Sequence, residues 1–147
     1  MPEMIRHATK QDIQLIEQFL QRAVVGKTNV KEAIDRFIIM ENDRGELLAT
    51  ISFQPCGEDA LLRSLVMSSD ATQQGIIHLF SAMVEFIHSK NMRDIYLVTS
   101  TGSAIPFFKL FHFAEVESSD VSVDIKEKIK VEGSSTGDIF YYMKYSV

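Results

Sequence analysis

The chain has no tryptophan, a single cysteine and three prolines among its 147 residues. One cysteine excludes an intrachain disulfide framework, and the first ten residues contain no apolar signal-peptide core, so we expect a reducing, cytoplasmic location. No apolar run is long enough to span a bilayer, which predicts no membrane partner. Acidic residues outnumber basic ones by 20 to 15, a formal net charge of −5, and this excludes a broad basic surface for nucleic acid.

What is present is ordinary for a globular protein. Hydrophobic residues make up 46% of the chain and charged residues 24%, values that exclude a disordered chain. The length suits one compact domain over residues 1–147. There is no internal repeat and no low-complexity tract.

Apolar periodicity predicts an α/β or α+β domain with a mixed sheet. The clearest helical pattern follows the polar loop 68–75, with apolar residues at i, i+3, i+4, i+7, i+8 and i+11. Thr9 to Asp12 form a capping-box-like helix start, and Asn29 is a cap for a second helix. The predicted strands are 4–8, 36–41, 46–54, 59–67, 94–99, 113–117 and 139–145, and the predicted helical segments are 13–23, 30–35, 76–87, 105–111 and 123–130.

Turn residues predict where these elements are joined. Asn42-Asp43-Arg44-Gly45 predicts a β-hairpin, and Pro55-Cys56-Gly57 predicts a break in the chain. Thr101 or Ser103 is the expected cap of the fourth helical segment. We expect the final strand, 139–145, to be exposed, where a homodimer contact could form.

The segment from Leu61 to Ile87 predicts a strand, a loop with one glycine and a helix. Such a loop presents unpaired N–H groups at the helix N-terminus, which is a binding site for phosphate groups. The lysine of a P-loop is absent, and Gly75 stands alone rather than in a dinucleotide fingerprint. An ordinary strand-to-helix connection is the alternative interpretation, and spacing alone does not decide between them.

The order of elements and several motifs resemble the GNAT family of acetyl-CoA-dependent N-acetyltransferases. Leu62-Arg63-Ser64-Leu65-Val66-Met67 resembles the family's fourth strand, and Thr72-Gln73-Gln74-Gly75-Ile76-Ile77 occupies its pyrophosphate loop. The segment from Ala104 to Phe113 resembles the family's A-x-x-F-Y-x-x-L-G-F run. Within the family, the likeness is closest to small amino-acid-acetylating and arsenic-operon-associated members. The segments that carry this closer likeness are Leu62 to Leu65, Tyr96 to Thr101 and Pro106 to Phe108.

The resemblance implies a GNAT-like acyl-CoA N-acyltransferase fold, with a mixed, mostly antiparallel sheet flanked by helices. The implied activity is transfer of an acetyl group from acetyl-CoA to a primary amine of a small molecule, with an amino acid as one candidate. The implied cofactor-binding residues are Leu65, Val66, Met67, Gln73, Gln74, Gly75, Ile76, Ile77 and Phe108. The candidate substrate-binding residues are Arg63, which could hold a carboxylate, together with Thr99 and Ser100. A structural ion pair for Arg63 and helix capping for the hydroxyl residues are the alternatives.

Four positions depart from the family pattern. Thr72 replaces the usual Arg or Gln, Ile77 stands where Gly or Ala is usual, and Phe108 replaces the tyrosine that protonates the leaving thiolate. His112 replaces a glycine. The changes in the loop and at Phe108 favour the alternative function, a non-catalytic GNAT-fold binding or regulatory protein with a degenerate cofactor loop. Acetylation of a protein N-terminus or lysine is a third hypothesis.

The sequence identifies no catalytic residue and no metal site. Glu41, Glu46 and Glu58 are candidates for a base that acts through water, but solvated carboxylates at strand ends are the more common case. The four histidines lack metal-ligand spacing. Cys56 has no histidine near it in the sequence, so we do not expect an activated thiolate.

Overall fold

The computed structural model describes residues 3–22, 29–99, 102–132 and 141–146. The strands are β1 (Met4–His7), β2 (Phe37–Glu41), β3 (Leu47–Cys56), β4 (Asp59–Met67), β5 (Ile95–Thr99), β6 (Phe113–Val116) and β7 (Tyr141–Tyr145). The α-helices are α1 (Ile13–Arg22), α2 (Val30–Ala33), α3 (Gln73–Ser89), α4 (Ile105–Lys109) and α5 (Val123–Glu132). Short 3-10 turns η1 (Lys10–Asp12), η2 (Ile34–Arg36), η3 (Gly102–Ala104) and η4 (Ser118–Asp120) complete the described elements.

The strands form a mixed, mostly antiparallel sheet in the order β1-β2-β3-β4-β5-β7-β6. The parallel pair is β4 with β5, through Ala60 opposite Ile95 and Leu61 opposite Tyr96. The predicted mixed α+β fold class is therefore confirmed. In the described residues, no helix combines the length and apolar character that a membrane crossing requires.

The chain forms two compact units. The first unit contains Met1–Gln54 and Arg63–Phe86, and the second contains Pro55–Leu62 and Ile87–Val147. Strands β3 and β4 contribute residues to both. The prediction of a single domain stays a prediction.

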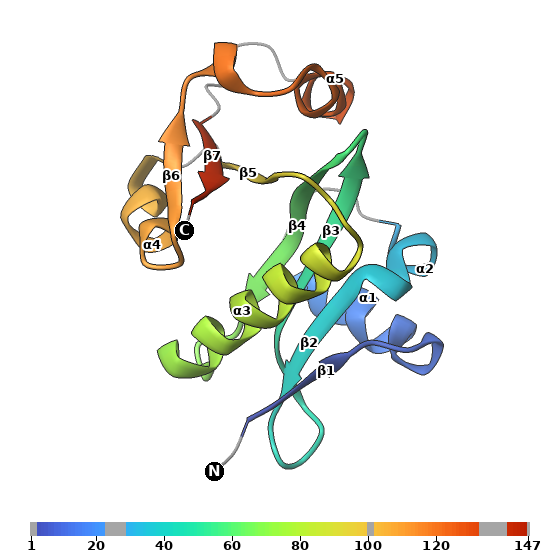
Figure 1. The fold of residues 1–147 in the computed structure, drawn as a ribbon. Helices are drawn as coiled ribbons and strands as arrows, with labels where there is room; N and C mark the ends of the chain where they lie inside the picture. The colour runs from blue at the N-terminus through green and yellow to red at the C-terminus, as the bar shows by residue number, and fades with distance from the viewer. Residues whose placement is uncertain (1–2, 23–28, 100–101, 133–140, 147) are drawn as a thin grey trace. The chain divides into compact units, whose positions relative to one another are not determined.

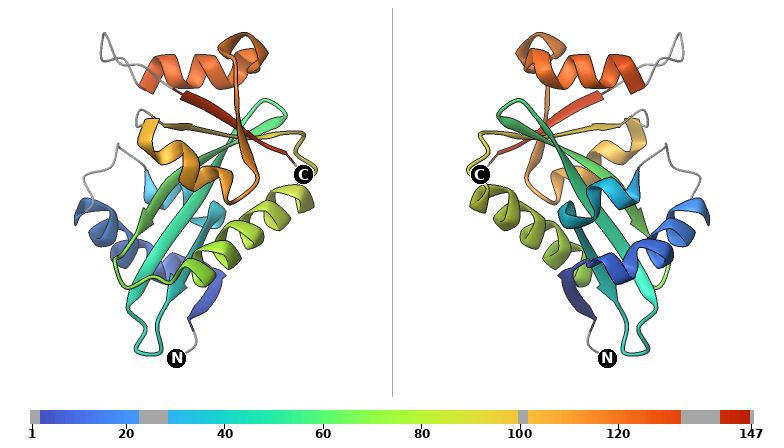
Figure 2. Two further views of the ribbon diagram at one scale, coloured as in Figure 1. Left: turned by 90° about the vertical axis from the view of Figure 1, so that its left-hand side faces the viewer. Right: turned by 90° about the vertical axis from the view of Figure 1, so that its right-hand side faces the viewer.

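In the first unit, α3 covers one face of β1–β3, and α1 with α2 covers the other (Figures 1 and 2). Side chains alternate along β2, so Phe37 and Ile39 pack against residues of α1 and α2 in one core cluster. Met40 belongs to the opposite face, where its Sδ lies close to Gly75 at the start of α3. Alternate side chains of β2 thus contact α1 and α2 on one face of the sheet and α3 on the other.

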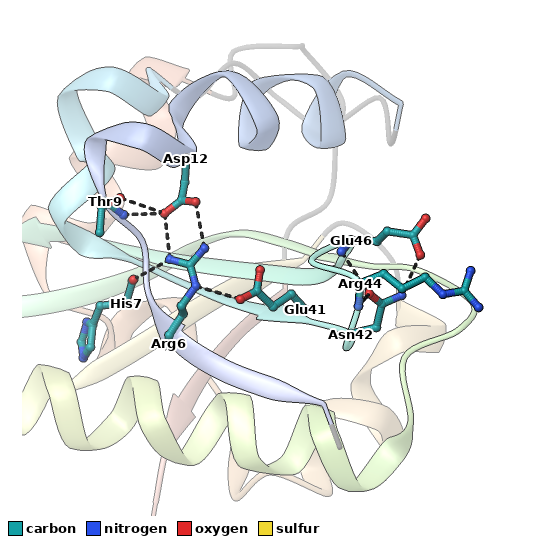
Figure 3. A network of polar contacts seen from close by, with 8 residues as sticks. All are labelled: Arg6, His7, Thr9, Asp12, Glu41, Asn42, Arg44 and Glu46. Carbon is teal, nitrogen blue, oxygen red and sulfur yellow. Dashed lines mark hydrogen bonds and ion pairs between the residues drawn. The ribbon is translucent and has the colours of Figure 1, made fainter. Parts of the chain in front are cut away.

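The N-terminal part of this unit is held by a partly buried ion-pair network (Figure 3). Arg6 donates two hydrogen bonds of 2.9 Å to the carboxylate of Asp12, and its Nε donates to Glu41 at 2.9 Å. Asp12 also accepts from the N–H of Thr9 at 2.7 Å, which completes the predicted capping box. The hydrogen bonds from Arg6 lower the pKa of Asp12 to about 2. Arg6 of β1 thus connects Glu41 of β2 with Asp12 at the start of the helix. The Asp12 carboxylate therefore stabilises the packing of this helix start on the two strands.

In the second unit, α5 packs on residues of β4, β5 and β7. The core cluster there contains Cys56, Leu61, Tyr96, Val121, Ile125 and Ile129. Asp59 is fully buried at the start of β4 and accepts from the Nε and Nη2 atoms of Arg93, both at 3.1 Å. Cys56 is buried.

Three local predictions are wrong. Pro55 and Cys56 do not break the chain but end β3, and the turn lies at Gly57 and Glu58. Proline is tolerated there because a strand end need not use its N–H in the ladder. Ser103 does not cap α4, since the cap residue is Ala104, which makes no side-chain hydrogen bond; Thr101 lies outside the described residues.

The third wrong prediction concerns the last strand. β7 is not an exposed edge, because it pairs with β5 on one side and β6 on the other. Residues 139 and 140 of the predicted strand lie outside the described part of the chain. The homodimer prediction loses the free edge on which it rested.

Candidate functional site

The central feature of the first unit is an irregularity in β4. Ser64 has a φ of 54°, which is uncommon for a non-glycine residue and unusual inside a strand. The turn between β3 and β4 consists of Gly57 and Glu58. With regular pairing on both strands, this turn would place Leu48 opposite Met67. Instead, the Leu48 carbonyl accepts from the N–H of Ser68 at 2.7 Å, one residue further along. β4 therefore contains one extra residue, which defines a β-bulge.

Two hydroxyl groups of β3 bind the backbone of this bulge. Thr50 donates from Oγ1 to the carbonyl of Ser64 at 2.8 Å, and Ser52 donates from Oγ to the carbonyl of Arg63 at 3.2 Å. Thr50 is 0% exposed and Ser52 is 1% exposed. Sequence reasoning missed both residues. The available signal was the pair of hydroxyl residues at alternate positions in the otherwise apolar run Leu47–Phe53.

These bonds determine which way the neighbouring peptide groups point. In a regular strand, successive carbonyls point in opposite directions, but those of Arg63 and Ser64 both point to hydroxyls of β3. All peptide bonds in the described residues are trans, so each N–H points opposite to the carbonyl of its own peptide group. The N–H groups of Ser64 and Leu65 are therefore directed to the same side, away from those hydroxyls. Successive N–H groups on one side can hold an anion or a carbonyl oxygen that gains negative charge.

The second feature is the N-terminus of α3. Thr72 caps the helix: its Oγ1 accepts from the N–H of Gly75 at 3.0 Å, and its carbonyl accepts from the N–H of Ile76 at 3.0 Å. The amides of Gly75 and Ile76, which were predicted to bind pyrophosphate, are thus engaged within the chain. An anion at this helix end would meet the amides of Gln73 and Gln74 first.

A carboxylate of the chain itself lies at this helix end. Glu3 accepts from the N–H of Thr72 at 3.1 Å and from its Oγ1 at 2.5 Å. A Cβ at Gly75 would overlap the Glu3 carboxylate and lie 2.7 Å from the Sδ of Met40. A side chain at position 75 would therefore have to displace the Glu3 carboxylate and the Sδ of Met40. The negative charge of Glu3 is favourable next to the positive end of the helix dipole.

No lysine or arginine occurs between Arg63 and Lys90 in the sequence. His78 lies one turn into α3, where its Nε2 is 3.4 Å from the Nε2 of Gln74. Anion binding at the start of α3 would therefore rest on backbone N–H groups and the helix dipole, without a fixed cation from this segment.

The other predicted cofactor residues differ in exposure. Val66 is buried and belongs to the core cluster, Met67 is 40% exposed, and Ile77 is 37% exposed on the surface of α3. The side chain of Ile77 is therefore at the surface rather than in the core.

The remaining predicted site residues divide between the two units. Arg63 is half-buried in β4 of the first unit. Thr99, at the end of β5, and Phe108, in α4, are half-buried in the second unit, and Phe108 makes an edge contact with Phe107 at 5.4 Å between ring centroids. Ser100 lies outside the described residues.

All three glutamates considered as bases have polar partners. Glu41 accepts from Arg6, Glu46 accepts from Asn42 at 2.8 Å, and Glu58 pairs with Arg93 at 3.3 Å. Figure 3 shows the first two of these pairs, from Arg6 to Glu41 and from Asn42 to Glu46. Among the described residues, no three His, Cys, Asp or Glu side chains are grouped as metal ligands.

No protein-family model matches the amino-acid sequence. It is 29% identical over 115 residues to the uncharacterized protein YwlB of Bacillus subtilis, a match that covers 78% of each chain.

Solved structures identify the fold. The chain matches a GNAT-family acetyltransferase of Staphylococcus aureus with a TM-score of 0.73 and 15% identity, over 99% of this chain and 100% of the other. The chain has the GNAT fold. It also matches Rv2747 from Mycobacterium tuberculosis, solved in complex with CoA, with a TM-score of 0.75 and 16% identity over 98% and 99% of the two chains.

A third match has a higher TM-score, but the matched protein is longer than this chain. N-acetylglutamate synthase from Neisseria gonorrhoeae, in complex with coenzyme A and N-acetyl-glutamate, aligns with a TM-score of 0.81 and 14% identity. The alignment covers 99% of this chain, which spans about a third (35%) of the synthase chain. None of these matches involves an arsenic-operon protein, so that closer resemblance stays a prediction.

Proposed function

We propose that this chain is an acetyl-CoA-dependent N-acetyltransferase that acts on the primary amine of a small molecule. The observation that carries the proposal is the β4 bulge, which directs two successive backbone N–H groups to one side of a strand on a GNAT fold. Two structures that share this fold at low sequence identity were solved with CoA.

Acetyl-CoA would supply an acetyl group activated as a thioester. The N–H of Leu65 would donate a hydrogen bond to the acetyl carbonyl oxygen, which becomes negative when the amine nitrogen attacks the carbonyl carbon. The bond between that carbon and sulfur then breaks. Because this step needs donors that are already oriented, a bulge fixed by Thr50 and Ser52 suits it better than a mobile loop would.

Proton transfer would involve solvent. The attacking amine must be neutral, and it loses a proton as the amide forms, while the departing sulfur gains one. Phe108 has no proton to give, and Glu41 is held by Arg6. We therefore propose that water accepts the proton from the amine and supplies the proton to the sulfur.

We propose an amino acid as the acceptor. Arg63, at the bulge, would bind the acceptor carboxylate through its guanidinium group, which matches a carboxylate with two parallel hydrogen bonds. One structure of similar fold was solved with N-acetyl-glutamate, which is an acetylated amino acid.

The pyrophosphate would bind at the start of α3, first through the amides of Gln73 and Gln74. The other predicted residues, Gly75, Ile76 and Ile77, follow in the same helical turn. Glu3 already provides a negative charge at this helix end. Like charges at one helix terminus repel, so binding would require Glu3 to move away. We therefore expect the affinity for acetyl-CoA to be lower than it would be without the Glu3 carboxylate at this helix end.

The Glu3 contact also favours a second candidate function, a GNAT-fold protein that binds a partner without catalysis. In that case Glu3 would permanently complete the α3 cap, and acetyl-CoA would not bind. The two functions differ in whether the chain consumes acetyl-CoA.

The test is release of free CoA thiol from acetyl-CoA in the presence of a panel of amino acids and other small amines. The background thiol signal is low, because the sole cysteine, Cys56, is buried. We expect amine-dependent thiol release, with an acetylated amine of matching amount detected by mass spectrometry. A panel without turnover, combined with no binding of acetyl-CoA, would favour the non-catalytic function.

A further inference from the structure

We infer that Thr50 and Ser52 are positioning residues for acetyl transfer: their hydroxyl groups set the direction of the N–H groups that contact the acetyl carbonyl. The inference rests on the proposed function and adds to it two residues that touch neither substrate. It follows from the two hydrogen bonds from β3 to the bulge, at 2.8 Å and 3.2 Å.

The first step concerns the pairing of the two strands. Where β4 contains an extra residue, its carbonyls no longer lie opposite backbone N–H groups of β3 in the regular way. A backbone carbonyl at such a place can accept a hydrogen bond from a side-chain donor. The hydroxyls of Thr50 and Ser52 do this for Ser64 and Arg63.

The second step concerns spacing. Thr50 and Ser52 are two residues apart on a strand, so their side chains lie on the same face of β3. The carbonyls that they bind belong to consecutive residues, which can turn to the same side because Ser64 adopts a positive φ. The two hydroxyls thus stabilise the unusual conformation of Ser64 rather than a regular strand.

The third step connects this conformation to the reaction. The Ser64 carbonyl and the Leu65 N–H belong to one planar peptide group, so rotation of the carbonyl also rotates the N–H. Loss of the Thr50 hydroxyl would remove a hydrogen bond that helps to hold this plane. The Leu65 N–H would then lose its alignment with the acetyl oxygen, an alignment that matters most in the transition state.

The test uses Thr50→Val, which removes the hydroxyl with little change of shape, and Thr50→Ser, which restores it. We expect Thr50→Val to lower kcat at least tenfold with the KM for acetyl-CoA changed less than twofold, and Thr50→Ser to recover most of the loss. Ser52→Ala should give a smaller loss of kcat, since its bond is longer. The matched control is Ile51→Val, a change at a fully buried residue between the two, which should leave kcat unchanged.

The results separate this inference from the proposed function. If the wild-type chain transfers acetyl groups and Thr50→Val keeps its kcat, or loses it no more than Ile51→Val does, the positioning role is overturned. If the wild-type chain transfers none, the proposed function fails and the positioning role in catalysis fails with it. Amide hydrogen exchange then still tests the structural part: Thr50→Val should change the exchange rate of the Leu65 N–H at least tenfold more than Ile51→Val does, and equal rates would refute the anchoring.

Discussion

Replacement of Asp12 by asparagine tests the ion-pair network that holds the first unit together. Asp12 is nearly buried, with 10% of its side chain exposed, and Arg6 lowers its pKa from 3.8 to about 2. A shift of this size corresponds to roughly 2.4 kcal/mol of folding free energy. Since Arg6 keeps 34% of its side chain exposed, water screens the pair, and we expect a contribution of about 1–2 kcal/mol.

The sign of the pH dependence follows from the lowered pKa. The charged carboxylate stabilises the fold above the unfolded-state pKa near 4, and this stabilisation is lost as the pH falls from about 4 to 2. We therefore expect Asp12→Asn to be less stable than the wild type by about 1–2 kcal/mol at pH 7, with the difference shrinking toward pH 2.

The assay is urea unfolding followed by far-ultraviolet circular dichroism at pH 7, 5, 4, 3 and 2.5. The control is Asp43→Asn, which alters an exposed carboxylate in the turn between β2 and β3 and should leave stability within about 0.5 kcal/mol of the wild type. A difference between Asp12→Asn and wild type that is the same at pH 7 and pH 2.5 would refute the assigned role of the ion pair.

Three further substitutions test the candidate site. Glu3→Gln should bind acetyl-CoA several-fold more tightly in calorimetric titration, because it removes the negative charge at the start of α3. The control Glu117→Gln, which changes an exposed carboxylate elsewhere, should leave the affinity unchanged. Equal affinities of Glu3→Gln and the wild type would show that Glu3 does not compete with acetyl-CoA. Arg63→Ala should raise the KM for an amino-acid acceptor about tenfold or more with the KM for acetyl-CoA unchanged, and an unchanged acceptor KM would exclude the carboxylate contact. Ile77→Gly should preserve or improve affinity for acetyl-CoA, while a marked loss in a folded variant would contradict the assignment of the pyrophosphate loop.

Much of the fold could be predicted because its signals are local. Thr9 and Asn29 cap their helices as expected, since capping depends on residues two or three positions apart. The apolar period of α3 was also readable, because its buried residues repeat at helical spacing, and the bounds of β4 were readable from its apolar residues. The place of β7 between two strands was not, because the order of strands depends on pairing between distant segments.

The site was only partly predictable for the same reason. The segment 65–77 carried a recognisable likeness, but the bulge depends on a positive φ at Ser64, a conformation for which serine has no special preference. Its support by Thr50 comes from a different strand. The contact between Glu3 and Thr72 joins residues 69 positions apart, and no local pattern reports such a contact.

The most direct test of the central claim, that the chain binds and uses acetyl-CoA, is thermal unfolding by calorimetry with acetyl-CoA, CoA or ATP. Calorimetry is preferable because the chain has no tryptophan. Ligand at 100 times its Kd should stabilise the fold by about 2.7 kcal/mol, which raises the Tm by several degrees for a domain of this size. Our account predicts a rise with acetyl-CoA and CoA but not with ATP. No rise at millimolar acetyl-CoA would contradict it.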